Sequence, residues 1–447
     1  MSSHSFKVIV VGGGPAGLTA AHALQLAGID FVVLERRTNI IEDLGASLVL
    51  GPPSLRVMHQ FGILGDLLGV GHEIIRNRSF DSDGNVLHES TEILRLRKNH
   101  GLAPVAFHRA QLVETLYNGL PDSAKDKVLL GKKLSDIQPD EKGVSVTCED
   151  GSSYHGSVVL GVDGVHSKTR QLMRKLALES NSPGDWDAEK PFASSYRCMW
   201  CSFPRPSEPG DAFDTQHKDK SVMYLAGRER GWIFLYEKLP ETTRERASYT
   251  DADMQTYIDK FKDFPVTDNL KVQDVWEKRF TAGMANLEEG IAGHWSWGRI
   301  VLAGDAAHKF TPNAGLGLNT AIQDIVSLCN GLWSLKRTFA KRLTSSDEEL
   351  SQLTTFFETY GRERKALISG DASRSALVTR THAWANPLYY FLAQYVLSAK
   401  IVESFMLEFL AKRSMKKALV LNYVNVDEPM VGAVEWDHPL VGAAKAR

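Results

Sequence analysis

The sequence predicts an α/β protein in which a parallel sheet is interrupted by a second, mostly antiparallel sheet and followed by helices. An apolar strand at residues 7–11 runs into a glycine-rich turn and a helical stretch, the start of a βαβ unit. Apolar strands at residues 157–161 and 299–303 each lead into a turn containing Asp and Gly. Residues 185–290 are rich in aromatic and alternating residues, which is typical of antiparallel strands.

The first turn has the spacing Gly-x-Gly-x-x-Gly, formed by Gly12, Gly14 and Gly17. The first glycine allows a tight turn, the second lets a pyrophosphate approach the backbone, and the third lets the helix pack on the strand. The helix N-terminus offers unpaired N–H groups to the phosphates. A second apolar strand ends at Glu35, 18 residues after Gly17, where a carboxylate can bind ribose hydroxyls. These features predict a Rossmann-type dinucleotide site.

Composition excludes several classes of protein. The 447 residues include 52 basic and 54 acidic side chains, so the net charge of −2 gives no reason to expect a nucleic-acid partner. The N-terminus is short and polar and does not resemble a signal peptide, which favours a cytoplasmic location. Four cysteines suit a reducing compartment.

Cys198 and Cys201 form a C-x-x-C pair, a spacing also found in metal and redox sites. They lie in a predicted strand at residues 195–203, where side chains three positions apart point to opposite faces. We therefore expect no metal here.

The later segments carry further candidate residues. Asp163 and Gly164 follow the strand at 157–161 and either cap the next helix or face a cofactor. Asp305 and its loop follow a strand at the carboxyl edge of the sheet, where ligands bind. The candidates in this third segment are Gly304, Asp305, Pro312, Gly315, Gly317 and Leu318. Nucleotide-binding segments about 290 residues apart indicate one long ligand, which FAD fits better than NAD.

Arg109 begins a predicted helix at residues 109–120. An arginine in this position can reach a phosphate or a flavin oxygen, or it can form a surface salt bridge. The sequence leaves both alternatives open.

The motifs divide the chain into three expected regions. Residues 1–75, 100–180 and 293–370 form a discontinuous cofactor domain, residues 76–99 and 181–292 a substrate-binding sheet domain, and residues 371–447 a C-terminal helical segment. Further helices are expected at residues 54–68, 348–369 and 371–383.

The C-terminal segment has an unusual charge pattern. Residues 383–399 carry no charge, and four basic residues follow at 412–417. The stretch is short for a membrane span. Either it docks on the protein core, the outcome we expect, or it lies on a membrane surface as a peripheral contact.

Together, the glycine motif with Glu35, the Asp163-Gly164 segment and the Gly304-Asp305 segment resemble the class A FAD-dependent monooxygenases over roughly residues 5–370. This resemblance implies a glutathione-reductase-like cofactor fold. Details such as Tyr196-Arg197-Cys198-Met199 are most similar to the fungal PaxM-type branch, which oxidises prenylated indoles and terpenoids in secondary metabolism.

The resemblance implies a role for each candidate. Glycines 12, 14 and 17 would hold the FAD pyrophosphate, Glu35 the adenosine ribose, Arg109 the ribityl-phosphate part and Asp305 the ribityl chain. The backbone at 312–319 would face the isoalloxazine, and Asp163 with Gly164 would serve the pyrophosphate and NAD(P)H use. Val49 and Leu318 stand where the branch usually has smaller residues, so these side chains would narrow the pocket.

The implied reaction uses NADPH or NADH, FAD and O₂ to hydroxylate or epoxidise an electron-rich small molecule through a C4a-hydroperoxyflavin. Arg197 is the candidate catalytic donor to the substrate, because its strand is expected to line the substrate pocket. Its alternative is a structural ion pair. Other open functions are hydroxylation of a simple phenol or salicylate, and dehydrogenation without oxygen transfer.

Two further functions are disfavoured. The pair Trp295 and Trp297 begins like the W-x-W-x-I-P motif of flavin halogenases, but Arg299 and Ile300 stand where Ile and Pro would. A non-enzymatic FAD-binding scaffold is disfavoured because the loop at 312–319, expected to face the isoalloxazine, is intact.

Overall fold

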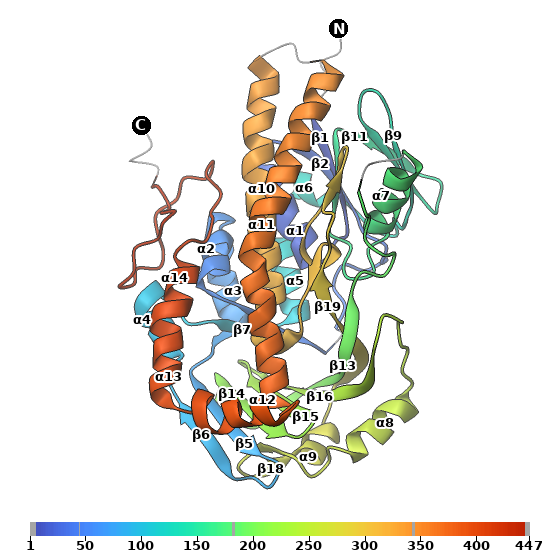
Figure 1. Ribbon diagram of the computed structural model, residues 1–447. Coiled ribbons are helices and arrows are strands. Elements are labelled where there is room, and N and C mark those ends of the chain that lie inside the picture. The colour runs from blue at the N-terminus through green and yellow to red at the C-terminus, as the bar shows by residue number, and fades with distance from the viewer. Residues whose placement is uncertain (1–5, 44, 181–183, 342–344, 443–447) are drawn as a thin grey trace.

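A computed structural model describes residues 6–43, 45–180, 184–341 and 345–442. The two longest helices, α10 (Leu316–Lys341) and α11 (Ser346–His382), contact each other and run side by side along the molecule (Figure 1). The cofactor-type sheet lies around their upper part in this view, and the larger second sheet lies around the lower end of α11. The structure confirms the predicted α/β class with two separate main sheets.

The first sheet has six strands and is parallel except at one edge. In spatial order, its strands are β20 (Ser296–Trp297), β21 (Ile300–Leu302), β12 (Val158–Gly161), β1 (Lys7–Val11), β2 (Asp30–Leu34) and β8 (Val128–Leu129). The central strands are apolar and almost fully buried, as expected for a parallel sheet covered on both faces. Helix α1 (Pro15–Leu26) follows β1 and packs against α10.

The sequence explains why α1 begins and ends where it does. Gly14 is its N-cap, and Pro15 occupies the first helical position, where a missing N–H costs no helical hydrogen bond. Gly28 follows with a φ of 62°, a left-handed conformation that ends the helix before β2.

The second sheet has eight strands. In spatial order they are β22 (His308–Lys309), β19 (Thr281–Ile291), β13 (Ala193–Pro204), β16 (Arg230–Thr243), β15 (Lys220–Ala226), β14 (Asp211–His217), β5 (Arg76–Asp81) and β6 (Val86–Ser90). All neighbours are antiparallel except β14 and β5. The inserted sheet was therefore predicted with the correct strand orientation. Cys198 and Cys201 belong to different hydrophobic clusters on its two faces, which confirms that they point apart.

Smaller elements complete the architecture. Short sheets are formed by β9 (Leu134–Pro139), β10 (Val144–Cys148) and β11 (Ser153–Gly156), by β3 (Ser47–Leu50), β4 (His72–Glu73) and β7 (Val105–His108), and by β17 (Pro265–Thr267) and β18 (Leu270–Lys271). The remaining helices of the first 280 residues are α2 (Pro52–Gln60), α3 (Leu64–Val70), α4 (Leu94–His100), α5 (Arg109–Asn118), α6 (Asp122–Lys125), α7 (Lys168–Glu179), α8 (Asp251–Asp259) and α9 (Val272–Trp276).

Two helix predictions were wrong. The helix expected at residues 54–68 is divided into α2 and α3, because Gly62 adopts a φ of 79° between them. The two helices expected at 348–369 and 371–383 are one continuous helix, α11. A side chain at Gly370 would meet no atom within 4 Å, so this glycine lies on an open helix surface and breaks nothing. Helix α11 also crosses the expected domain boundary at residue 370.

After α11 the chain forms a series of short helices and then an irregular tail. These are α12 (Pro387–Phe391), the π-helix η3 (Leu392–Leu397), α13 (Lys400–Phe405), the π-helix η4 (Met406–Ala411) and α14 (Lys412–Met415). The tail packs on α2, where buried Arg56 pairs with Glu428 at 2.7 Å. None of the helices in the described ranges combines the length and hydropathy that a bilayer crossing needs.

Candidate active site

The three predicted motifs meet at one edge of the parallel sheet. Strands β1, β12 and β21 are neighbours, and their last residues Val11, Gly161 and Leu302 lie in register. The glycine turn, the Asp163 turn and the Asp305 turn follow these three ends, so segments almost 300 positions apart come together, as the sequence predicted.

A cavity of about 1350 Å³ opens at this edge and extends to the second sheet. This volume exceeds the roughly 300–1,000 Å³ of a typical small-ligand pocket, so the cavity has room for a dinucleotide and a substrate together. The predicted residues that line it are Gly12, Gly14, Glu35, Val49, Arg109, Asp163, Gly164, Asp305, Pro312, Gly315, Gly317 and Leu318. Gly17, Gly304 and Arg197 are not among its lining residues.

The glycine turn has the shape that a close phosphate requires. Gly12 has a φ of 111°, and a Cβ on it would lie 2.6 Å from the carbonyl oxygen of Val162. A Cβ on Gly17 would lie 1.8 Å from the carbonyl oxygen of Gly12, so this glycine serves the contact between helix and turn. Gly14, by contrast, faces open space within the cavity wall. A side chain there would fill the volume in front of the α1 N-terminus.

Glu35 is buried, and both of its carboxylate oxygens are held. Oε2 accepts a hydrogen bond from the Gly13 amide at 2.7 Å, and Oε1 accepts one from the Arg37 amide at 2.9 Å. Burial alone would raise the pKa of Glu35, but these hydrogen bonds and the Arg37 guanidinium outweigh it and lower that pKa. The carboxylate therefore stays ionised at the cavity wall as a hydrogen-bond acceptor.

The carboxylate of Asp163 is hydrogen-bonded to residues at the start of the following helix, α7. It accepts hydrogen bonds from the Ser167 hydroxyl and from the Thr169 amide at 2.9 Å. Desolvation in this turn raises its pKa despite the hydrogen bonds. Of the two alternatives left open by the sequence, this geometry favours helix capping by the side chain, and both Asp163 and Gly164 line the cavity.

The side chains of Arg109 and Asp305 have fewer bonds to neighbouring residues than that of Asp163, and both residues line the cavity. Within the described ranges the Arg109 guanidinium has no hydrogen-bond partner, and burial together with the nearby Arg37 lowers its pKa. Asp305 follows the end of β21 in the 3₁₀-helix η1 (Gly304–Ala306) and forms an ion pair with Lys309. A partly desolvated guanidinium beside a cavity is a good donor to phosphate or to a carbonyl oxygen.

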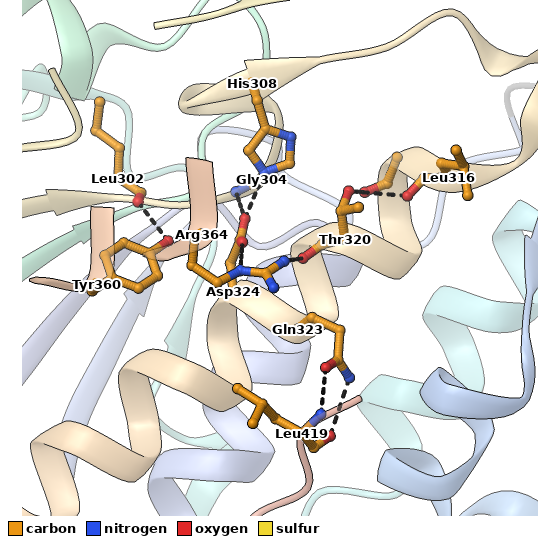
Figure 2. A network of polar contacts seen from close by, with 11 residues as sticks. Leu302, Gly304, His308, Leu316, Thr320, Gln323, Asp324, Tyr360, Arg364 and Leu419 are labelled. Atoms are coloured by element: carbon orange, nitrogen blue, oxygen red, sulfur yellow. Dashed lines mark hydrogen bonds and ion pairs between the residues drawn. The ribbon is translucent and has the colours of Figure 1, made fainter. Parts of the chain in front are cut away.

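A buried network, which the sequence analysis missed, holds the Asp305 turn. Figure 2 shows Asp324 of α10 between Gly304, His308 and Arg364. Its carboxylate accepts hydrogen bonds from the Gly304 amide at 3.0 Å, from His308 Nε2 at 2.6 Å and from Arg364 Nε at 2.7 Å. Burial alone would raise the pKa of Asp324, but His308 and Arg364 lower it. The sequence does contain a signal for this network, because Asp324 is an acidic residue in the apolar helical run between Ile322 and Ile325.

Asn319 is a second residue whose role the sequence analysis missed. Its Nδ2 donates to the carbonyl oxygens of Val49 at 2.8 Å and Gly315 at 2.7 Å. Its Oδ1 accepts from the Gly51 amide at 2.9 Å. One side chain thus joins β3 to the loop of the 3₁₀-helix η2 (Pro312–Ala314), and both segments line the cavity.

Comparisons with known proteins agree with this geometry. A family model described as "FAD binding domain" matches residues 5–349. The curated FAD-dependent monooxygenase ausM of Penicillium brasilianum is 34% identical over 399 residues, which is 87% of this chain and 82% of ausM. The FAD-dependent monooxygenase srdH of Neurospora crassa is 35% identical over 380 residues, 81% of this chain and 83% of srdH. The chain belongs to the FAD-dependent monooxygenases.

Solved structures support the same fold for this monooxygenase. HpxO of Klebsiella pneumoniae, complexed with FAD and uric acid, aligns with a TM-score of 0.69 at 20% identity, covering 92% of this chain and 96% of HpxO. The p-nitrophenol 4-monooxygenase PnpA of Pseudomonas putida aligns with a TM-score of 0.70 at 17% identity, covering 92% and 99%. The family resemblance predicted from the sequence is confirmed, and the protein is an FAD-binding oxidoreductase.

The monooxygenase cavity ends against one face of the second sheet. The side chains of this face are apolar on the central strands and polar toward β5; those lining the cavity are Phe234, Met223, Leu225, Ala212, Asp214, Gln216, Asn77 and Ser79. Asp214 is the centre of the polar part, where it accepts hydrogen bonds from Ser79 Oγ at 2.7 Å and Gln216 Nε2 at 2.9 Å. This sheet face is therefore apolar in its centre and carries one acidic side chain, Asp214, in its polar part.

Arg197 lies on the other face of this sheet. Its guanidinium pairs with Glu237 of β16, with Nε 2.8 Å from the carboxylate, and stacks over the Tyr257 ring of α8 at 5.2 Å. Cys198, the next residue, belongs to the cluster on the cavity side. The structure thus corrects the expectation that Arg197 faces the substrate pocket, and it favours the alternative of a structural ion pair.

Proposed function

We propose that this monooxygenase uses NADPH or NADH and O₂ to hydroxylate or epoxidise an electron-rich, largely apolar small molecule of the prenylated indole or terpenoid type. The main supporting observation is that one continuous cavity reaches from Gly14 to the apolar face of the second sheet. One oxygen atom of O₂ enters the product, and the other leaves as water with the electrons of NAD(P)H.

The residues at the sheet edge fit FAD. The open backbone at Gly14 and the N-terminus of α1 would receive the pyrophosphate, and Glu35 would accept a hydrogen bond from the adenosine ribose. Arg109 would donate to the ribityl-phosphate part and Asp305 would accept from the ribityl hydroxyls. Bound FAD supplies the electron transfer and oxygen activation, and the protein supplies binding, orientation and exclusion of water.

The loop before α10 is suited to negative charge on the cofactor. Gly317 and Leu318 lie in the first turn of this 26-residue helix and line the cavity. First-turn amides lack intrahelical partners and lie at the positive end of the helix dipole. They would therefore donate to an electron-rich edge of the isoalloxazine placed against the loop. Asn319 would keep this loop and Val49 at a fixed separation around the ring.

The substrate chamber supports an apolar substrate with one polar group. Its sheet face offers Phe234, Met223 and Leu225, which exclude water from a reacting carbon. Asp214 would accept a hydrogen bond from a hydroxyl or indole N–H and so fix which end of the molecule approaches the cofactor. A simple phenol or salicylate would leave much of this chamber unfilled, which is why we rank it second.

The cavity wall carries positive charge that would attract the electron donor. Arg36, Lys168 and Arg246 are exposed cations on the cavity wall. They complement the phosphates of NADPH or NADH, and a preference for NADPH would indicate that they bind its additional phosphate.

Oxygen incorporation tests the proposal directly. The purified holoenzyme is incubated with ¹⁸O₂, with NADPH or NADH, and with prenylated indoles, terpenoid phenols or simple phenols, and products are analysed by mass spectrometry. We expect one ¹⁸O atom in a prenylated or terpenoid product. Turnover of simple phenols alone would favour the aromatic hydroxylase alternative, and oxidised product without ¹⁸O would favour a dehydrogenase.

A further inference from the structure

The short C-terminal helices expose an unusual number of large apolar side chains. We call the set in α12, η3, α13 and η4 the outer apolar face; its members, with their exposed fractions, are Leu388 (62%), Phe391 (52%), Tyr395 (67%), Ile401 (80%), Phe405 (53%) and Phe409 (53%). The ring centroids of Phe391 and Tyr395 lie 5.3 Å apart in a tilted arrangement, and Phe405 stacks on Phe409 at 4.9 Å. Contiguous exposed apolar surface on a monomer usually marks an interaction site.

Three polar side chains of the same helices bond to the body of the protein. Glu403 accepts a hydrogen bond from His88 Nε2 at 3.0 Å, and Glu408 accepts one from Asn99 Nδ2 at 3.1 Å. Ser404 donates to Glu92. A helix that only packs on a protein core turns its apolar stripe inward and its charges outward. In these helices both acidic side chains bond to the body of the protein, while six large apolar side chains are exposed, so the outer apolar face needs another explanation than packing on the core.

The charges around this face are segregated by sign. Residues 387–417 contain two acidic residues, Glu403 and Glu408, and both bond to the body of the protein. The basic residues Lys400, Arg413 and Lys417 are exposed. Figure 1 shows α13 and α14 at the left side of the molecule, and α12 in front of the second sheet near the lower end of α11. An apolar, aromatic face beside outward cations complements an anionic lipid surface.

We infer that residues 387–417 dock on the surface of an anionic phospholipid bilayer, with the outer apolar face in the interface. The same helices form part of the cavity wall through Leu397 and Met406. Docking would therefore place the wall of the substrate chamber against lipid. The inference concerns the surface alone and does not depend on the proposed reaction.

Vesicle sedimentation of the full-length holoenzyme tests this inference. The vesicles consist of phosphatidylcholine alone or of phosphatidylcholine with phosphatidylserine. The test variant is the double change Ile401→Glu and Phe405→Glu, and the matched control is Leu26→Glu with Leu178→Glu. The control changes two leucines, each 45% exposed, on α1 and α7. Flavin absorbance and thermal unfolding verify that both variants fold.

We expect the wild type and the control to sediment with vesicles that contain phosphatidylserine, and to do so less at high salt. The partition coefficient of the test variant should be lower by a factor of about ten or more. A wild type that stays in the supernatant with both vesicle types would overturn the inference. Equal sedimentation of the test variant would do the same. If light scattering instead shows a dimer that the test variant converts to a monomer, and no vesicle binding, the occupant of this face is a second copy of the chain.

Discussion

Asn319 Nδ2 lies 2.8 Å from the carbonyl oxygen of Val49, although the two residues are separated by 270 positions. The same amide group bonds the carbonyl oxygen of Gly315, and Oδ1 accepts from Gly51. Two stretches of cavity-lining backbone thus share one side chain. If the cofactor ring lies between them, the width of its slot depends on Asn319.

Asn319→Ala should weaken FAD binding about tenfold or more, because several hydrogen bonds worth about 1 kcal/mol each are lost from the slot. Titration of apoprotein with FAD, followed by fluorescence, measures the change. The matched control is Asn330→Ala, since Asn330 makes a similar pair of bonds to Val420 and Asn422 and does not line the cavity. Equal FAD affinity in wild type and Asn319→Ala would show that the slot does not need this residue.

Asp305→Ala should also lose FAD while the chain still folds. The carboxylate is placed to accept from the ribityl hydroxyls, and loss of a charged hydrogen bond costs about 1.5–3 kcal/mol, roughly tenfold or more in affinity. Lys309→Gln is the control, because it removes the ion-pair partner of Asp305 and leaves the acceptor. An Asp305→Ala protein that retains FAD as tightly as the wild type would contradict the assigned role.

Asp324→Asn tests the buried network. The change leaves the Arg364 guanidinium buried beside a neutral amide, and breaking a buried ion pair on one side costs about 3–5 kcal/mol. We expect a lower urea midpoint of the holoenzyme, with most FAD still bound to the protein that remains folded. Asp371→Asn, a similar change in an acid of α11 that pairs with Arg374 and does not line the cavity, should leave the midpoint nearly unchanged. Unaltered stability of Asp324→Asn would mean that the network is not needed for the turn at Gly304.

The parts of the site that were predicted from the sequence are local in the chain. The glycine turn, α1 and Glu35 form one unit of about 30 residues, where each residue type has a requirement that its neighbours reveal. The convergence of the three turns followed from the rule that parallel strands end at the same edge.

What could not be predicted depends on pairing between distant segments. Asn319 and Asp324 look like ordinary polar residues of a helix until Val49 and Arg364 are placed beside them. For Arg197 the alternation of side chains in the strand was known, but which face meets the cavity depends on how β13 lies between β16 and β19. The same holds for two glycines of the predicted helical regions. Gly62 ends a helix and Gly370 does not, and this difference depends on packing that the sequence does not reveal.

Acid should destabilise the enzyme through two buried histidines. Burial lowers the pKa of His22 to about 4 and of His100 to about 4, from an ordinary value of 6.5. The unfolded chain therefore binds more protons than the folded one between these values, and stability falls as pH drops from 6.5 toward 4. Each histidine contributes on the order of 3 kcal/mol at most, because one pKa unit is about 1.4 kcal/mol.

Urea unfolding at several pH values checks this expectation. His22→Gln should reduce the loss of unfolding free energy between pH 6.5 and 4.5, whatever it does to stability at neutral pH. His155→Gln on the surface of β11 is the control. An identical pH slope in wild type and His22→Gln would show that His22 does not take part in acid destabilisation.

Arg197 is tested by separating stability from chemistry. Because its guanidinium pairs with Glu237 on the face away from the cavity, Arg197→Gln should lower the free energy of unfolding by about 1–2 kcal/mol. Glu237→Gln should cost a similar amount, and the double variant should cost less than the sum, since the second change removes a partner already lost. The ratio of oxygenated product to hydrogen peroxide should not change in any of the three. If stability is unaffected and product falls by roughly 10²-fold while peroxide rises, Arg197 is a transition-state donor and its side chain must turn to the other face of the sheet in the substrate complex.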